Sequence, residues 1–176
     1  VVVSIMPCTA KKDEMNREQL MNFGLKDVDY VLTTREFARM IKETGINFDD
    51  LPVEKFDDPM GESTGGADIF GNSGGVTAAV VESMKEMEAG IEPKVCKANG
   101  AAECRKFLML MKAGKLPDDF IEGMACEGGC VGGPSSFNDM LTTKKFRDEL
   151  LDKADDRKIL DNLKNYHMET FSMHRD

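Results

Sequence analysis

The sequence lacks three features that would place it in other classes of protein. It has no apolar run of the length needed to cross a membrane. It has no excess of basic charge, because 32 acidic residues against 23 basic ones give a net charge of −9, so nucleic acid is not an expected partner. Its five cysteines are an odd number without the spacing of a secreted disulfide framework, which favours a reducing compartment and a cytoplasmic location.

What the sequence does contain is the composition of one globular domain. With 176 residues, of which 41% are hydrophobic and 31% charged, the chain is long enough to bury a core. Short apolar runs alternate with helical patterns, which indicates the α/β class: a layered lobe with a small, mainly parallel sheet flanked by helices, plus C-terminal helices. The strands expected are 1–5, 28–32, 94–98 and one that ends at 124; the helices expected are 14–23, one between a Thr33–Glu36 capping box and Gly45, 74–89, 101–112, 142–154 and 155–166.

The most informative stretch is 124–134, in which Cys126 and Cys130 are separated by a glycine pair and followed by a second one. Glycine adopts positive φ and lets the backbone approach a bulky group closely. Successive amides in such turns form concave nests of the kind found around iron–sulfur clusters. We therefore interpret the stretch as an iron–sulfur ligand loop at the end of a buried strand. A glycine-rich turn with two unligated cysteines is the alternative that this stretch alone leaves open.

A second cysteine follows another predicted strand. Residues 1–5 run into Met6, Pro7 and Cys8, and ligands of open α/β sheets bind beyond the carboxyl ends of the strands. Two strand-end loops could therefore bring three thiols into one crevice. Thiolates are the soft ligands of iron–sulfur cubanes, which normally need four.

The remaining cysteines and the histidines bear on the choice of metal. Cys96 and Cys104 are candidates for a fourth ligand, although we expect small packing thiols at both positions. Three cysteines with one histidine would suit zinc. However, His167 and His174 lie in the polar C-terminal region, outside any cysteine–histidine motif. The sequence therefore favours an iron–sulfur cluster over zinc.

The pattern Met-Pro-Cys-x-x-Lys-x-x-Glu at 6–14 and the pattern Met-Ala-Cys-x-Gly-Gly-Cys at 124–130 resemble two active-site signatures of one enzyme family. They are similar to the second and third signatures of the catalytic domain of the iron-only (FeFe) hydrogenases. Segments 33–36, 61–65 and 70–76 also resemble that family, in the expected order.

The family's first signature, Thr-Ser-Cys with a nearby proline, does not occur in the sequence. The resemblance therefore implies that 1–176 is the C-terminal lobe of a hydrogenase H-cluster domain. We expect the chain to be a fragment of that domain, with 135–176 as a helical C-terminal extension.

The resemblance also implies which residues hold the cofactor. Cys8, Cys126 and Cys130 would bind a 4Fe–4S cluster, and the Cys130 thiolate would bridge it to a diiron unit that carries carbon monoxide, cyanide and a dithiolate. Lys11 would donate to an iron-bound cyanide, because a buried cation needs an anionic partner. From its local sequence alone, Lys11 is a solvated lysine at a helix start. The other cofactor-binding candidates are Met6, Pro7, Glu14, Phe70 and Met124.

The two methionines would surround the diiron unit with apolar thioethers, although core methionines have the same pattern. Phe70 and the turn after it would lie beside the site. Glu14 could pair with a cation there or favour the N-terminus of a helix.

The reaction implied is the reversible reduction of protons to dihydrogen by a parent enzyme of the ferredoxin hydrogenase type. The cysteine expected to relay protons belongs to the missing signature, so we assign no catalytic residue. We expect this chain alone to be inactive and to hold no complete cluster. The partners implied are the N-terminal lobe of the same protein and a ferredoxin-like electron carrier or a signalling protein. Self-association of an exposed lobe is a secondary hypothesis.

The end of the third signature differs from that of the best-known catalytic members. Their longer glycine-rich run ends in Gln-Pro, whereas 130–134 is shorter and runs into Ser135. This resembles a sensory branch of the family, so a hydrogen sensor is one alternative. A hydrogenase-like iron–sulfur assembly or binding protein without hydrogen chemistry is another. Lys11 speaks against the latter, since a protein that holds only cubanes has no cyanide to contact.

Overall fold

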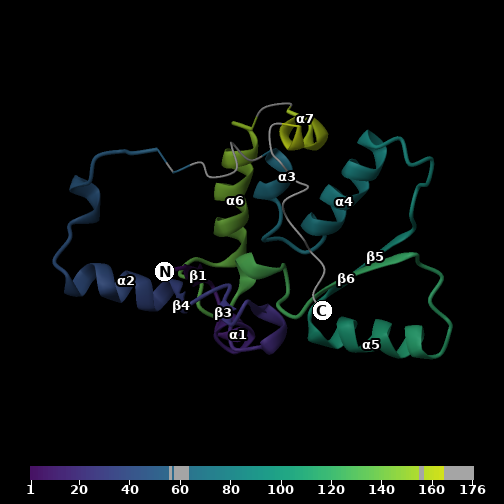
Figure 1. Cartoon of the computed structure of the whole chain (residues 1–176), viewed down its shortest axis with the longest axis horizontal. Helices are drawn as coiled ribbons and strands as arrows, with labels where there is room; N and C mark the ends of the chain where they lie inside the picture. Colours follow the sequence, from purple (N-terminus) through teal and green to yellow (C-terminus); the bar gives the residue numbers. More distant parts are fainter. Residues whose placement is uncertain (56, 58–63, 155–156, 165–176) are drawn as a thin grey trace. The chain divides into compact units, whose positions relative to one another are not determined.

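A computed structural model of the chain describes residues 1–55, 57, 64–154 and 157–164 (Figure 1). It divides into two compact units, the first with the described residues of 1–57 and 133–139 and the second with those of 58–132 and 140–174. Each unit contains a two-stranded parallel sheet. None of the helices in the described ranges combines the length and apolar character that a membrane crossing needs.

The first unit is organised around strands β1 and β4. Its elements are β1 (Val3–Met6), α1 (Ala10–Glu14), a 3-10 helix (Glu18–Leu20), β2 (Met21–Asn22), β3 (Leu25–Lys26), β4 (Tyr30–Thr33), α2 (Thr34–Glu43) and a second 3-10 helix (Phe48–Asp50). In the parallel pair, Val3 lies opposite Tyr30 and Met6 opposite Thr33. The strand ends that precede the Cys8 loop and α2 are therefore neighbours.

The second unit repeats this arrangement with β5 and β6. Its elements are α3 (Gly65–Asp68), α4 (Gly75–Glu86), β5 (Val95–Asn99), α5 (Ala101–Lys112), β6 (Phe120–Met124), a 3-10 helix (Cys130–Gly132), α6 (Met140–Leu151) and α7 (Ile159–Leu163). Asn99 lies opposite Met124, so both strands end at the same edge of the sheet. The crossover helix α5 packs along both strands (Figure 1).

The predicted α/β class is confirmed, with small parallel sheets flanked by helices. The strand that ends at Met124 and the helix at 101–112 agree with the prediction, and the helices before Gly45 and Gly90 end within a few residues of these glycines. Of the predicted helix at 155–166, the described part forms α7, and residues 61–63, His167 and His174 lie outside the described residues.

The helix predicted at 14–23 is wrong. The helix in this region, α1, begins earlier and ends at Glu14. The side-chain amide of Asn16 donates to the carbonyl of Lys12 (2.9 Å), which satisfies an acceptor at the end of α1. Phe23 and Gly24 then both adopt positive φ, at 52° and 76°. Two such residues form the tight turn of a β-hairpin, which connects β2 to β3.

The core of each sheet is made of small side chains. Val31 and Thr33 of β4 are both 5% exposed, and Ala98 of β5 is 1% exposed. On β6, Glu122, which lies opposite Lys97, is buried although it carries a carboxylate. Buried carboxylates need hydrogen-bond donors, so this residue indicates a specific polar contact in the second unit.

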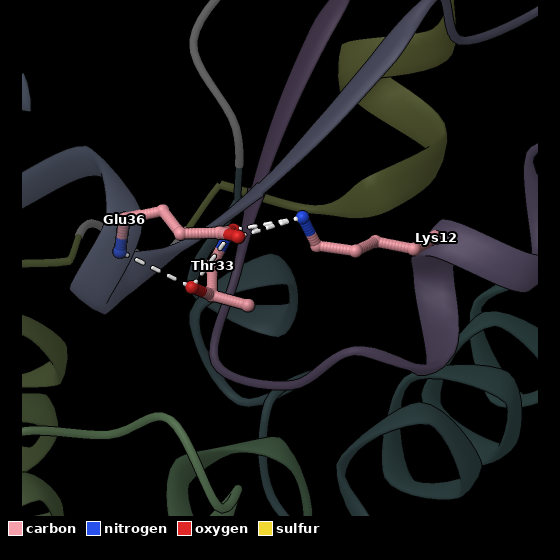
Figure 2. Close-up of polar contacts among 3 residues, drawn as sticks. All are labelled: Lys12, Thr33 and Glu36. Carbon is pink, nitrogen blue, oxygen red and sulfur yellow. Dashed lines mark hydrogen bonds and ion pairs between the residues drawn. The ribbon is translucent and has the colours of Figure 1, made fainter.

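The predicted capping box at the start of α2 is confirmed (Figure 2). The Glu36 amide donates to the Thr33 hydroxyl (3.2 Å), and the Thr33 amide donates to the Glu36 carboxylate (2.8 Å). Lys12 adds an ion pair to the same carboxylate (2.8 Å). The hydrogen bonds from Lys12 and then Thr33 lower the pKa of Glu36 to about 2. The box thus connects the loop after β1 to the start of α2.

This lowered pKa predicts a loss of stability in acid. Because the folded pKa lies below the ordinary value of 4.5, the contribution of Glu36 is present above that value and is lost as the pH falls toward 2. We expect the protection of the α2 amides, measured as the exchange rate relative to the intrinsic rate at each pH, to fall between pH 5 and pH 3, and we expect Glu36→Gln to reduce this pH dependence. Glu43→Gln, at the exposed end of the same helix, is the control. An unchanged pH dependence in Glu36→Gln would contradict the assignment.

Candidate metal centre

The Cys8 loop begins where β1 ends. Met6 is the last residue of β1, Pro7 follows it, and all three residues from Met6 to Cys8 are half-buried. The Pro7 carbonyl accepts a hydrogen bond from the Ser135 amide (2.8 Å). The backbone next to Cys8 is therefore held by a segment distant in sequence.

That segment, 133–139, is fixed to the start of α2. The Thr34 hydroxyl donates to the Ser135 carbonyl, and the Arg35 guanidinium donates to the Ser136 carbonyl (3.0 Å). The same guanidinium lies 5.3 Å from the centroid of the Phe137 ring, a cation–π geometry. The Cys8 loop, the start of α2 and this returning segment thus form one connected structure in the first unit.

Lys11 and Glu14 form an ion pair on α1. The Lys11 ammonium lies 2.7 Å and 2.6 Å from the two carboxylate oxygens of Glu14, and both side chains are partly exposed. Within the structure, the partner of the Glu14 carboxylate is therefore the Lys11 ammonium on the same helix. A pair this exposed adds little to stability. The ion pair does restrict the orientation of the Lys11 ammonium on α1, the helix that follows Cys8.

The Cys126 loop begins where β6 ends at Met124, which is half-buried. Cys126 is half-buried and Cys130 is exposed, and none of the five cysteines, all of which are described, is in a disulfide. Gly128 and Gly129 adopt φ of +82° and +87°. These values allow the Gly129 amide to donate to the Cys126 carbonyl (3.0 Å), which closes the turn between the two thiols.

Hydrogen bonds from two directions hold this loop in place. The Gly128 amide donates to the side-chain oxygen of Asn99 at the end of β5 (2.6 Å). On the other side, the Ser73 amide donates to the Gly128 carbonyl (3.2 Å), and the Val131 amide donates to the Gly71 carbonyl (3.1 Å). The loop therefore rests on the turn between α3 and α4, which we call the 70–75 turn.

Glu122 holds the 70–75 turn in place. The carboxylate of Glu122 accepts hydrogen bonds from the Gly74 amide, the Thr77 amide (2.8 Å) and the Thr77 hydroxyl (2.6 Å). Burial opposes the charge of Glu122, but these hydrogen bonds outweigh it, and the pKa of Glu122 is lowered. A charged carboxylate thus binds the first amides of α4. Phe70, at the start of the turn, is about half exposed.

The glycines of the cysteine loop are needed for this packing. A methyl group on Gly129 would lie 2.6 Å from the Gly71 carbonyl oxygen and 2.6 Å from the Ser73 amide nitrogen. Both are backbone atoms, which cannot rotate away. The glycine pair therefore allows a close approach, and in the described residues the approach is between the backbone of Gly129 and the backbone of Gly71 and Ser73.

Cys96 and Cys104 are packing residues in the second unit. Cys96 is 8% exposed in β5, and burial, followed by the charges of Asp118 and Glu103, raises the pKa of its thiol. Cys104 lies on α5, and its sulfur would be 3.2 Å from a methyl group on Gly123. A thiol held protonated inside the sheet is a poor metal ligand, in agreement with the packing role expected for Cys96.

Among the described residues, no group of three or more histidine, cysteine, aspartate or glutamate side chains is arranged to hold a metal ion. The three predicted ligands are divided between the units, with Cys8 in the first and Cys126 and Cys130 in the second. Their chemistry fits an iron–sulfur cluster, because each is a thiol at a strand-end loop and the two in the second unit lie on a tightly fixed turn.

The residues that hold the cysteine loop were not predicted from the sequence as such; they are Asn99, Ser73, Thr77 and Glu122. One signal was present, since an acidic residue inside the apolar strand 120–124 is unusual and implies a buried partner. Asn99 had a weaker signal as a polar residue at a strand end before glycine. Ser73 acts through its backbone amide, for which sequence carries no signal.

The backbone contact at Gly129 leads to a prediction. We expect Gly114→Ala, at φ +64° with open space around it, to lower the free energy of unfolding by about 1 kcal/mol, the cost of a left-handed alanine. Gly129→Ala has this cost and the backbone clash, so we expect a clearly larger loss, of about 3 kcal/mol or more. Urea denaturation of both variants would measure the difference. Equal losses would mean that the 70–75 turn does not support the loop.

Comparison with known proteins identifies the family. Residues 1–134 match the C-terminal domain of the iron-only hydrogenase large subunit. The chain is 44% identical to the periplasmic iron hydrogenase large subunit of Nitratidesulfovibrio vulgaris, over 74% of this chain and 37% of that relative. It is 26% identical to a cytosolic Fe–S cluster assembly factor of Xenopus tropicalis, over 74% of this chain and 34% of that relative.

The fold agrees with that of solved hydrogenases. A variant of the FeFe-hydrogenase HydA1 from Chlamydomonas reinhardtii superposes with a TM-score of 0.71 at 26% identity, and the match covers 99% of this chain and 59% of that one. The chain spans about a third of the length of the curated relatives it matches. In the full protein, the family implies a 4Fe–4S cluster and an H-cluster. The chain belongs to the iron-only hydrogenase large-subunit family, through the match of residues 1–134 to the C-terminal domain.

Proposed function

We propose that this chain is the part of an iron-only hydrogenase that provides three cysteine ligands of the H-cluster, in an enzyme that reversibly reduces protons to dihydrogen. The observation that carries the proposal is the pair of cysteine loops, each of which follows a parallel strand that ends in methionine. Both loops lie within the range that matches the family, 1–134. The identity to a hydrogenase, 44%, exceeds the identity to an assembly factor, 26%.

Cys8, Cys126 and Cys130 would hold the 4Fe–4S cluster as thiolates, and Cys130, the most exposed of the three, would also bridge to the diiron unit. When bound, the cluster supplies the electrons and the metal at which protons and dihydrogen interconvert. The chain supplies the ligands, the second shell of hydrogen bonds and the exclusion of water.

The covalent structure of the chain is compatible with ligands from both units. Only residues 131–134 lie between Cys130 and Ser135, and the Ser135 amide is bonded to the carbonyl of Pro7, the residue before Cys8. A short peptide therefore connects the two loops.

Lys11 would donate to a cyanide of the diiron unit. Its ammonium is already paired with Glu14, which supplies an anionic partner until a ligand arrives. We propose that Glu14 orients this ammonium and that the cyanide competes for one of its three N–H donors. Glu14 would thus restrict the Lys11 side chain to one orientation on α1, the helix that follows the Cys8 loop.

The other candidates would line the site with apolar groups. Met6 and Met124 end their strands, Pro7 follows Met6, and Phe70 begins the 70–75 turn. All are half-buried or half-exposed, so they are available to cover a bound group. Their role would be to keep water from the diiron unit and to contact it with polarizable sulfur.

The remainder of the parent domain would cover the first unit. Parallel sheets normally have both faces buried, yet Val3, Ile5 and Tyr30 on one face of the β1–β4 pair are 50%, 42% and 61% exposed. We propose that the N-terminal lobe of the same protein packs there, with 1–176 as the C-terminal lobe and 135–176 as its helical extension. Self-association through the same face is expected of the isolated chain.

The electron partner would be a ferredoxin-like carrier, or a signalling protein if the sensory alternative holds, because the short run 130–134 resembles the sensory branch. We propose a cytoplasmic location, because the spacing of the five cysteines is not that of a secreted disulfide framework. One similar relative is named as a periplasmic protein, so cell fractionation is the test of location.

A second candidate function is iron–sulfur assembly without hydrogen chemistry. It is favoured by the 26% identity to a protein named as a cytosolic Fe–S cluster assembly factor. Such a protein would use the same cysteines for cubanes alone. The two functions differ in whether Lys11 has a cyanide to contact.

Iron binding tests the ligand set. In the protein that contains this chain, we expect Cys8→Ser, Cys126→Ser and Cys130→Ser each to lose most of the iron retained after anaerobic reconstitution, because a cubane needs all its thiolates. Cys96→Ser, a buried thiol of the same chain, is the control and should keep its iron. We also expect no hydrogen evolution from the chain alone. Equal iron loss in Cys96→Ser, or appreciable turnover, would contradict the assignment.

Infrared spectroscopy separates the two functions. In the protein that contains this chain, we expect absorption from iron-bound carbon monoxide and cyanide, and we expect Lys11→Met to lower hydrogen evolution about tenfold or more, through the loss of a hydrogen bond from a charged donor. The neighbouring Lys12→Met, which breaks an ion pair with Glu36 instead, should keep most of the activity. A protein with bound iron but no such absorption would support the assembly function.

A further inference from the structure

We propose that Glu122 is a positioning residue of the Cys126–Cys130 loop, which it keeps in its ligand-presenting conformation by fixing the 70–75 turn on which the loop rests. The inference rests on the proposed function of these two cysteines as cluster ligands. Glu122 itself would not touch the cluster. It would act through the backbone of Gly74 and the side chain of Thr77.

The contacts of Glu122 require a carboxylate. Three donors converge on it, from the Gly74 amide, the Thr77 amide and the Thr77 hydroxyl, and an ionised carboxylate has acceptors only. Glu122 is 8% exposed and Thr77 is 1% exposed, so water cannot replace these hydrogen bonds without opening the structure. A glutamine of the same shape would turn an N–H group toward one of the donors.

The turn transmits this constraint to the cysteine loop. Gly74 follows Ser73, whose amide donates to the Gly128 carbonyl between the two cysteines (3.2 Å). Gly71, at the other end of the turn, accepts from the Val131 amide next to Cys130 (3.1 Å). The backbone that carries both thiols is therefore hydrogen-bonded to the backbone that Glu122 holds.

The contacts close a ring. Strand β6 carries Glu122 and runs directly into the loop at Cys126, the loop rests on the 70–75 turn, and the turn is bonded back to Glu122. Loss of the contacts to Glu122 would open the ring. The contacts to Glu122 are made to a charged carboxylate, and hydrogen bonds to charged groups are the strong ones.

The same unit offers a matched control in Glu86. Its two carboxylate oxygens accept from the Ile159 amide (3.1 Å) and the Leu160 amide (2.8 Å), at the start of α7. This is the same chemistry as that of Glu122, but none of these hydrogen bonds reaches the cysteine loop. Glu86→Gln therefore reports what the loss of a structural carboxylate does in general.

The first test uses the metal-free full chain. We expect Glu122→Gln to accelerate amide exchange at Ser73 and Val131 and alkylation of Cys126 roughly tenfold or more, as the loss of hydrogen bonds to a charged group implies. Cys8, in the first unit, and the buried Cys96 should keep their alkylation rates. Glu86→Gln should accelerate exchange at Ile159 and Leu160 but leave Cys126 unchanged.

Thr77 provides a second variant in case Glu122→Gln folds poorly. Thr77→Val removes one of the three donors at constant shape, whereas Thr77→Ser keeps the hydroxyl. We expect the alkylation of Cys126 to be fastest in Glu122→Gln, slower in Thr77→Val and slowest in Thr77→Ser. The rate in Thr77→Ser should be close to that of the unmodified chain.

After anaerobic reconstitution of the protein that contains this chain, we expect the electron paramagnetic resonance spectrum of the reduced cluster to change in Glu122→Gln and Thr77→Val. The spectrum should not change in Glu86→Gln. If Cys126 alkylation and the exchange of Ser73 and Val131 stay within twofold in both variants, the positioning role is refuted. If these rates change as expected but the unmodified protein that contains this chain binds no iron, the positioning role stands and the proposed function fails.

Discussion

The hydrogen bonds between the Glu122 carboxylate and the start of α4 are the constraint on which the geometry of the second unit depends. A charge inside a sheet is costly unless several donors surround it. Here the donors come from Gly74 and Thr77, and both belong to the segment that supports the Cys126 loop. The same interaction therefore satisfies a buried charge, caps a helix and fixes the support of two thiols.

The two units solve the same problem by different means. In each, a parallel strand ends in methionine and a cysteine loop follows. The Cys8 loop is held from outside its own stretch of sequence, by the Ser135 amide and by the capping box that Lys12 joins. The Cys126 loop is held mainly by backbone contacts that only glycine permits. The second loop thus depends on its glycines, whereas the first, at 6–10, contains none.

Membership of the hydrogenase family narrows the function without deciding it, because the family also has relatives named for iron–sulfur assembly. The residue types that separate these functions are few. The cysteines suit any cubane, whereas a lysine that stays on α1 beside an acidic partner suits a site with an additional anion. The difference between the functions therefore lies in the second shell of the proposed cluster.

The sequence by itself determined the α/β class, the strand that ends at Met124, the helix at 101–112 and the capping box of Thr33 and Glu36, because these depend on local periodicity and neighbouring side chains. It did not determine the hairpin at 21–26, where the backbone of Phe23 and Gly24 overrode a helical pattern. Only the tertiary structure decided that Asn99, Ser73 and Glu122 hold the cysteine loop. These contacts join segments far apart in the chain, and one of them is made by a backbone amide that every residue but proline possesses.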